Sequence, residues 1–411
     1  MNEAPEGLTA VARARIALVA YVCSPGEGSE PGTGWVWARM LASFADVTLI
    51  TIDDEPRTRS TDQRIAELGL GDRIHHVTVP YPRWWIRALW HFERLSYLVW
   101  QLGMPTQGRA VGLHFDLAWH ITLTNVWLGS TGYQLARRFV LGPVGGGVAT
   151  PWRVTPVLGA AGLLFEVNRT IARFVGRWLN PLSRAAWTHA ELILVPNRET
   201  VAWLPADARS RAVMFPSVAL EDSPADHRQG RPARAASPKR DDAMHVITAG
   251  RLVPWKGIAL AIRAMSYLPG WRLTIIGDGP DRGRLERLAR KRGLAERVEF
   301  AGWLSTRDAV QERLLGADAL IFPSLHEEGG WACAEAVAAG VPVISLDCGG
   351  PLILGARGVR ASSPERTARA IALAVQEEVA SSGRRVDDTW SFNRRRDALV
   401  ALLGERGLLL P

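Results

Sequence analysis

Short apolar segments alternate with amphipathic ones along almost the whole chain, and this alternation constrains the fold more than any other feature. In the first half, an apolar run of β-type residues (16–22) precedes a Gly/Pro-rich loop, a helical stretch (35–44) and a second apolar run (47–52). Apolar runs of this length are typical of parallel strands joined by helices. We therefore predict a βαβ unit at the start of an α/β protein.

The same alternation predicts further strands in both halves, with helices between them. In the first half the strands are expected at 74–79, 117–121, 138–141 and 192–195. In the second half they are expected at 245–249, 272–276, 298–300, 319–322 and 342–346, and helices at 256–267, 281–291, 306–315 and 331–339.

Residues 221–243 carry charges, prolines and small side chains but almost nothing large and apolar. Such a segment has little surface to bury, so we expect an exposed linker. It separates an N-terminal domain (1–220) from a second domain (244–390), and a C-terminal helix (391–411) is expected to pack back on the first. We predict two Rossmann-like, doubly wound domains facing across a cleft, with ligands at the carboxyl ends of strands.

Composition excludes several classes of protein. The 411 residues carry a net charge of +8, but the basic residues are scattered among acidic ones and no nucleic-acid-binding motif accompanies them. The three cysteines form neither a disulfide framework nor a zinc-type pair. The apolar stretch 154–165 is too short to span a bilayer, and the N-terminus lacks a signal-peptide pattern. We expect a cytoplasmic protein, at most peripheral at the inner membrane face.

The segment after the first strand of the second half combines two cations with a tight turn. It reads GRLVPWKG, with Gly250 at the strand end and Arg251 and Lys256 before a helix. A rigid guanidinium fork and a mobile ammonium suit two adjacent phosphates, and a helix N-terminus adds N–H donors. Two solvated surface cations are the simpler alternative.

Two carboxylates flank a glycine turn further along, in the run HEEGGWACAEA. Glu327 is expected just before a helix and Glu335 in its second turn. A carboxylate accepts two hydrogen bonds at once and so matches a vicinal diol. Gly329 and Gly330 between them expose backbone N–H groups to a ligand. Two glutamates at this spacing often occur by chance. They indicate a binding site only in combination with the loop that carries Arg251 and Lys256.

Taken together, the motifs GRLVPWKG, GDGP, VEFAGW and HEEGGWACAEAVAAGVPVISLDCGG resemble the donor-binding domain of retaining GT-B glycosyltransferases of family GT4. The resemblance covers roughly residues 245–350. In the first half, the loops SPGEGSEPGTGW and LGPVGGG and the segment DLAWHIT are similar to those of bacterial members. That half usually binds the acceptor.

The resemblance implies roles in the second domain. Arg251 and Lys256 would neutralise the diphosphate of a nucleotide sugar, for which a UDP-sugar is the expected donor. Glu335 would hold the ribose and Glu327 the transferred sugar. Backbone contacts to the donor are implied for Gly250, Gly329, Gly330 and Trp331, and residues 298–303, ending at Trp303, would lie against the base.

It also implies roles in the first domain. Gly32 and Gly34 would let the first loop approach the diphosphate. His120, at a strand end, would face the reacting sugar or the acceptor, although a core histidine is an equal alternative. Gly145 and Gly146 would form an acceptor-side loop or simply build a turn.

The resulting expectation is a retaining, metal-independent transferase with no cofactor, because the sequence contains no Asp-x-Asp. The acceptor is expected to be a glycan, a lipid or a secondary metabolite. A nucleotide-sugar epimerase of the same architecture, or a non-catalytic nucleotide-sugar or lipid-binding protein, is the alternative.

The aromatic and basic segment 81–103 favours either of two structures. Its apolar residues recur at helical spacing, which predicts a half-buried helix. Its interleaved Trp and Arg residues are also compatible with contact to a membrane surface or a lipid.

Overall fold

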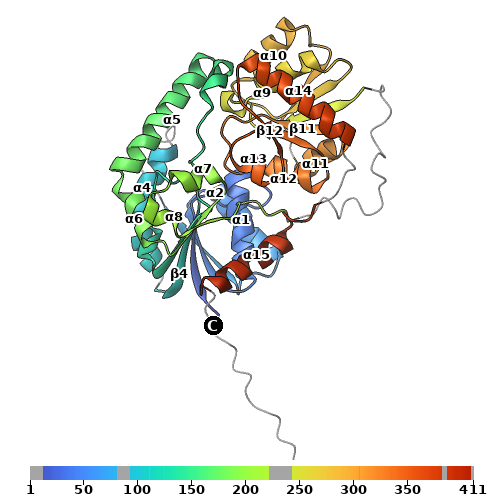
Figure 1. The fold of residues 1–411 in the computed structure, drawn as a ribbon. Helices are drawn as coiled ribbons and strands as arrows, with labels where there is room; N and C mark the ends of the chain where they lie inside the picture. The colour runs from blue at the N-terminus through green and yellow to red at the C-terminus, as the bar shows by residue number, and fades with distance from the viewer. Residues whose placement is uncertain are drawn as a thin grey trace, which may run out of the picture.

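The computed structural model describes residues 13–80, 93–110, 112–123, 125–221, 243–304, 306–381 and 387–408. They form two α/β lobes, each built on one parallel sheet (Figure 1). The first seven strands belong to the first lobe and the last six to the second lobe. Most of the predicted 221–243 linker lies outside the described residues.

The sheet of the first lobe has the strand order β3-β2-β1-β4-β5-β6-β7. Its strands are β1 (Arg15–Ala20), β2 (Asp46–Ile52), β3 (Ile74–Val79), β4 (Phe115–Thr122), β5 (Ala136–Leu141), β6 (Leu192–Val195) and β7 (Ala212–Met214). The order reverses between β1 and β4, as in a doubly wound sheet. The helices of this lobe are α1 (Ser29–Ala42), α2 (Glu55–Glu67), α4 (Glu93–Ala110), α5 (Gly159–Leu179), α6 (Pro181–His189), α7 (Arg198–Trp203) and α8 (Ala206–Arg209).

The sheet of the second lobe has the order β10-β9-β8-β11-β12-β13, and it reverses between β8 and β11. Its strands are β8 (His245–Ala249), β9 (Arg272–Ile276), β10 (Val298–Gly302), β11 (Ala319–Phe322), β12 (Val343–Leu346) and β13 (Arg357–Val359). Its helices are α9 (Ile258–Ala264), α10 (Arg282–Lys291), α11 (Arg307–Gly316), α12 (Trp331–Ala338), α13 (Gly350–Ile353) and α14 (Pro364–Ser381).

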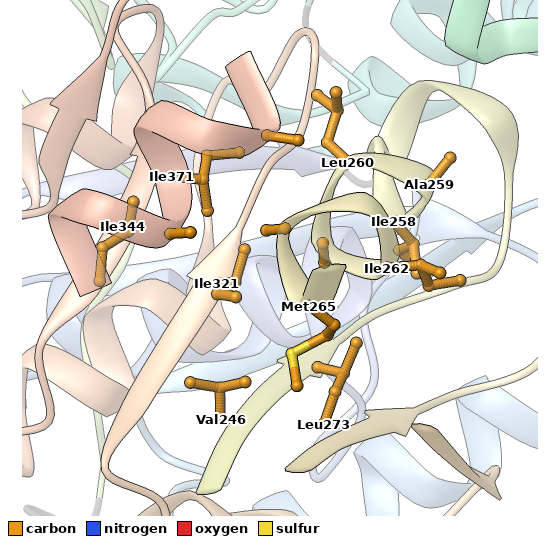
Figure 2. Close-up of a cluster of buried hydrophobic side chains, with 14 of the residues drawn as sticks. Val246, Ile258, Ala259, Leu260, Ile262, Met265, Leu273, Ile321, Ile344 and Ile371 are labelled. Carbon is orange, nitrogen blue, oxygen red and sulfur yellow. The ribbon is translucent and has the colours of Figure 1, made fainter. Parts of the chain in front are cut away.

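Helix α9 is buried on nearly every side because six of its seven residues are apolar and inaccessible. It packs between the sheet and α14, and Figure 2 shows Ile258, Leu260 and Ile262 among side chains of β8, β9, β11 and β12. A helix packed this way is a rigid support for the loop that precedes it, which carries Lys256.

The last helix, α15 (Phe392–Glu405), returns to the first lobe and lies beside α1 (Figure 1). Leu399 and Leu403 join the apolar core beneath the first sheet. The Arg395 guanidinium donates to the Pro216 carbonyl at 2.8 Å and stacks on Phe215.

The predicted strands coincide with the observed ones, and two were missed. These are β7 and β13, edge strands of three residues each, which are too short to show a pattern. Helix α1 begins at Ser29, earlier than the predicted residue 35, because the sequence SEPG forms its first turn.

Candidate functional site

The cationic loop after β8 lies at the point where the strand order of the second lobe reverses. Arg251 is exposed, and its guanidinium makes no hydrogen bond or ion pair with the residues that the structure describes. A short 3-10 turn (Pro254–Lys256) follows, and Gly257 adopts a left-handed conformation before α9. A Cβ on Gly257 would lie 2.0 Å from the Pro323 carbonyl oxygen, so this glycine lets the loops after β8 and β11 pack together.

Lys256 and Glu327 form an ion pair, although they were expected to bind different parts of the donor, the diphosphate and the transferred sugar. The ammonium Nζ lies 2.5 Å from the carboxylate Oε2, and both side chains are largely shielded from solvent. An ammonium has three donors, so Lys256 can hold this carboxylate and an anionic ligand together. Glu327 in turn fixes the position of the lysine charge.

Glu335 lies in the second turn of α12, as the sequence predicts, and is 7% exposed. It accepts a hydrogen bond from Arg307 Nε at 2.9 Å. Burial raises the pKa of Glu335, and the adjacent Arg307 opposes this shift. Arg307 was not among the predicted site residues, although the N-capping residue Thr306 marks the start of its helix.

The glycine turn before α12 orients the neighbouring side chains. Gly330 is left-handed and precedes the first helical residue, Trp331, while Gly329 lies half-buried beside it. The indole of Trp331 packs under the Arg307 guanidinium at 5.3 Å. The side chain of Trp331 thus contacts Arg307, the partner of Glu335.

Glu328, which was not among the predicted site residues, connects the two lobes. Its Oε2 accepts hydrogen bonds from Asn197 Nδ2 at 2.7 Å and Thr200 Oγ1 at 3.2 Å. Its Oε1 accepts from the Val148 amide at 3.2 Å. Gly145 lies against this carboxylate, because a Cβ there would be 2.7 Å from Glu328 Cγ.

The loop expected on the acceptor side therefore packs, at Gly145, against the second lobe. Its neighbour Gly146 packs against the Asn125 side chain, which a Cβ at that position would overlap. In this structure both glycines allow close packing between protein segments.

A second polar connection joins His326 to helix α5. His326 Nε2 lies 2.7 Å from Glu166 Oε1, and Arg169 donates to the same carboxylate at 3.1 Å. Burial alone would raise the pKa of Glu166, but His326, Arg169 and Thr150 outweigh it and lower this pKa to about 2. Burial lowers the pKa of His326. The imidazole also stacks on Trp255, and so does Phe165 of α5, at 4.1 Å between ring centroids, which brings α5 into contact with the cationic loop.

The structure places His120 in the core of the first lobe, which does not match the expectation that it faces a reacting sugar. The side chain is fully buried on β4, and its Nδ1 lies 2.5 Å from Ser130 Oγ. Tyr97 contacts the other ring nitrogen at 3.4 Å. Burial lowers the pKa of His120 to about 3, which favours the neutral ring, and its position matches the alternative of a core histidine.

Gly32 and Gly34 also differ from their expected position. Both lie in the first turns of α1, not in the loop before it. A Cβ would lie 2.1 Å from the Glu27 carbonyl oxygen at Gly32 and 2.6 Å from that of Val22 at Gly34. The two glycines let the helix pack against its own preceding loop.

Trp303 follows β10 and is 75% exposed. The exposed aromatic surface of this side chain, at the carboxyl edge of the sheet, leaves a face on which a planar ring can stack.

Gly250 directly follows β8, and its amide donates a hydrogen bond to the Ile276 carbonyl of β9.

Half of the segment 81–103 is described. Residues 81–92 lie outside the described residues, and the remainder belongs to α4. Tyr97 and Trp100 are buried in the core of the first lobe, whereas Leu95 and Leu102 are exposed. None of the helices in the described ranges is long and apolar enough to cross a bilayer.

The family model described as "Glycosyl transferases group 1" matches residues 231–386. A D-inositol 3-phosphate glycosyltransferase of Mycobacteroides abscessus is 34% identical over 361 residues, covering 82% of this chain and 75% of that protein. The lipopolysaccharide core glycosyltransferase LpsE of Rhizobium meliloti is 39% identical over 110 residues. That match covers 27% of this chain and about a third (32%) of LpsE.

The fold is also found in solved structures. HepE of Anabaena, in complex with UDP and glucose, aligns over 95% of this chain and 99% of its own, with a TM-score of 0.57 and 15% identity. The two-lobed arrangement is therefore the GT-B fold, as the sequence predicts. With the inositol phosphate relative matched over three quarters of its length, the chain belongs to the group 1 glycosyltransferases.

Proposed function

We propose that the protein transfers a sugar from a nucleoside-diphosphate donor to a hydroxyl acceptor, with retention of configuration at the anomeric carbon. One observation carries the proposal: the Lys256–Glu327 ion pair and the exposed Arg251 belong to the loops after β8 and β11, between which the strand order of the second sheet reverses. Ligands of doubly wound sheets bind at that point. Arg251 is exposed there without a protein partner among the described residues.

In the proposed complex, Arg251 and Lys256 bind the diphosphate and stabilise the negative charge that develops as it leaves. Glu335 accepts hydrogen bonds from the ribose, and Glu327 from the transferred sugar. Trp303 lies against the base. HepE, which shares the fold, was solved with UDP and glucose, and this supports UDP as the nucleotide of the donor.

The proposed reaction needs no protein nucleophile. The bond from the anomeric carbon to the diphosphate oxygen breaks, and a bond to the acceptor oxygen forms on the same face of the sugar. The acceptor proton passes to a phosphate oxygen of the leaving group. His120 is fully buried on β4 and takes no part in the proposed route.

We also propose that the transfer is metal-independent and uses no cofactor. The sequence has no Asp-x-Asp, and two cationic side chains can neutralise a diphosphate in place of a divalent ion. Activity that persists unchanged in EDTA is the expected result. The proposed acceptor is a hydroxyl of a glycan, a lipid or a secondary metabolite, and the proposed location is the cytoplasm, with peripheral membrane contact.

The test combines donor binding with two variants. UDP-, GDP-, ADP- and dTDP-sugars are compared by thermal shift, because a ligand that binds the native state raises the Tm. Arg251→Ala and Lys256→Ala should abolish the shift given by the preferred donor and the turnover. Lys291→Ala, which removes an exposed lysine of α10, is the matched control. Full activity in both site variants would refute the assignment.

Product analysis separates the alternatives. An epimerase would convert the donor without an acceptor. A binding protein would give the thermal shift but no turnover with any acceptor.

A further inference from the structure

Helix α5 has its polarity reversed relative to an ordinary surface helix. None of its exposed positions carries a charged side chain, and the polar ones are Asn168 and Thr170. The large exposed side chains recur three and four residues apart, which places them along one face. This apolar face consists of Leu163, Leu164, Val167, Ile171, Phe174, Val175, Trp178 and Leu179.

Three ionised residues of α5 face the protein instead. Glu166 and Arg169 are each 5% exposed and bind one another and the first lobe, and Glu166 also binds His326. Arg173 donates to the Gly147 carbonyl at 2.6 Å. Rotating the helix to hide its apolar face would break all of these contacts, so they fix the face outward.

Each end of the apolar face carries an exposed tryptophan with an arginine stacked on it. At the start, Arg153 stacks on Trp152 at 5.2 Å. At the end, Arg177 stacks on Trp178 at 5.3 Å, and Arg184 donates to the Trp178 carbonyl. Tryptophan and arginine are the side chains that favour the boundary between hydrocarbon and lipid headgroups.

The accessible charged side chains at the ends of this face, within residues 151–190, are those of Arg153, Arg177 and Arg184. Residues 151–190 contain five arginines and one acidic residue, the buried Glu166, and the whole chain carries +8. An isologous dimer would place these arginines against the same basic patch of a second copy, and the one acidic residue of this segment, Glu166, is buried. Anionic headgroups complement the arginines instead.

We propose that the apolar face of α5 docks onto the surface of an anionic lipid bilayer. The helix lies on the outer edge of the first lobe, where a flat surface can reach it (Figure 1). Its side chains from Leu163 to Leu179 enter the headgroup and acyl boundary, and the flanking arginines bind lipid phosphates. The opposite side of α5 contacts Trp255 and His326. A docked bilayer would therefore lie about one helix diameter, about 10 Å, from the loop that carries Lys256.

Vesicle co-sedimentation of the full chain tests the proposal. Vesicles of phosphatidylcholine alone are compared with vesicles in which a third of the lipid is phosphatidylglycerol. The double variant Ile171→Glu/Phe174→Glu changes two positions that are 56% and 67% exposed, so the fold should tolerate it. Leu373→Glu on α14, at 55% exposure, is the matched control.

We expect the wild type and the control to sediment with the anionic vesicles, and the double variant to bind at least about tenfold more weakly. The milder variant Phe174→Gln should give an intermediate loss. Equal binding by all variants, or no binding by the wild type, would overturn the proposal. So would a dimer in light scattering that the double variant dissociates, because the face would then bind a second copy.

The donor-induced thermal shift separates this proposal from the proposed transferase activity. It should be the same for the wild type and the double variant, since neither substituted side chain contacts the donor loop. If the double variant no longer binds vesicles but keeps the donor-induced thermal shift, the membrane contact of α5 is lost while the donor site is intact.

Discussion

Replacing Glu328 should weaken the contact between the lobes by an amount that the structure allows us to estimate. Its carboxylate accepts three hydrogen bonds, and the three donors belong to Val148, Asn197 and Thr200, all fully buried. A buried donor left without an acceptor costs about 1–3 kcal/mol. Glu328 itself is half-exposed and water can reach it, so we take the lower limit for each donor. Glu328→Ala should then cost about 3 kcal/mol.

Glu328→Gln should cost less, about 1–2 kcal/mol, because one oxygen remains as an acceptor. Its amide group must face a donor in either orientation, the Val148 N–H or the Asn197 NH₂ group. The penalty therefore comes from the change of acceptor to donor and not from lost volume.

Thermal unfolding followed by tryptophan fluorescence measures these effects. About 1 kcal/mol shifts the Tm of a domain of 150–250 residues by about 2–4 °C, so Glu328→Ala should lower it by several degrees. Glu296→Gln, at an exposed position of the second lobe, is the control. A cycle with Thr200→Val should show a coupling energy of about 0.5 kcal/mol or more. A Tm equal to that of the control, with no coupling, would refute the reasoning.

Three further predictions concern pH, backbone conformation and donor binding. The lowered pKa of Glu166, about 2, stabilises the fold above its ordinary value of 4.5, and this contribution is lost as the pH falls toward 2. Glu166→Gln should thus cost up to roughly 3 kcal/mol in urea unfolding at pH 7 and less than about half of that at pH 3. An equal cost at both would contradict this. Gly257→Ala should destabilise the protein more than Gly270→Ala. Both glycines are left-handed, but only a Cβ at Gly257 would overlap a neighbour. Equal urea midpoints for the two variants would argue against that overlap. Trp303→Ala should raise the donor KM about tenfold without changing the Tm. Trp152 is equally exposed, and Trp152→Ala should leave the donor KM unchanged. The same rise in KM in both variants would remove Trp303 from the donor site.

The strands could be predicted because a parallel strand buried on both faces is a short apolar run between turn residues. The runs at 245–249, 272–276 and 319–322 end where β8, β9 and β11 end. The loops after β8 and β11 could then be assigned to one edge of the sheet. The edge strands β7 and β13 could not be predicted, since three residues are too few for periodicity.

The partners of the site residues could not be predicted, because they are set by contacts between distant segments. Glu328 meets Asn197 across 131 positions of sequence, and Lys256 meets Glu327 across 71. The burial of His120 depends on Tyr97 and Ser130, which share no motif with it. The outward apolar face of α5 could not be predicted for the same reason. Its sequence has the periodicity of any amphipathic helix, and only the packing shows which face is exposed.

The return of α15 to the first lobe has a consequence for motion. The chain crosses between the lobes twice, once after Leu220 and once before Ser391, and the two crossings are hydrogen-bonded side by side, Leu220 N to Trp390 O at 2.7 Å and Phe392 N to Leu220 O at 2.8 Å. Two covalent tethers joined at one place act as a hinge with a defined axis. Any opening of the lobes about this axis would have to break the hydrogen bonds that Glu328 accepts from Asn197 and Thr200, far from the tethers in the sequence.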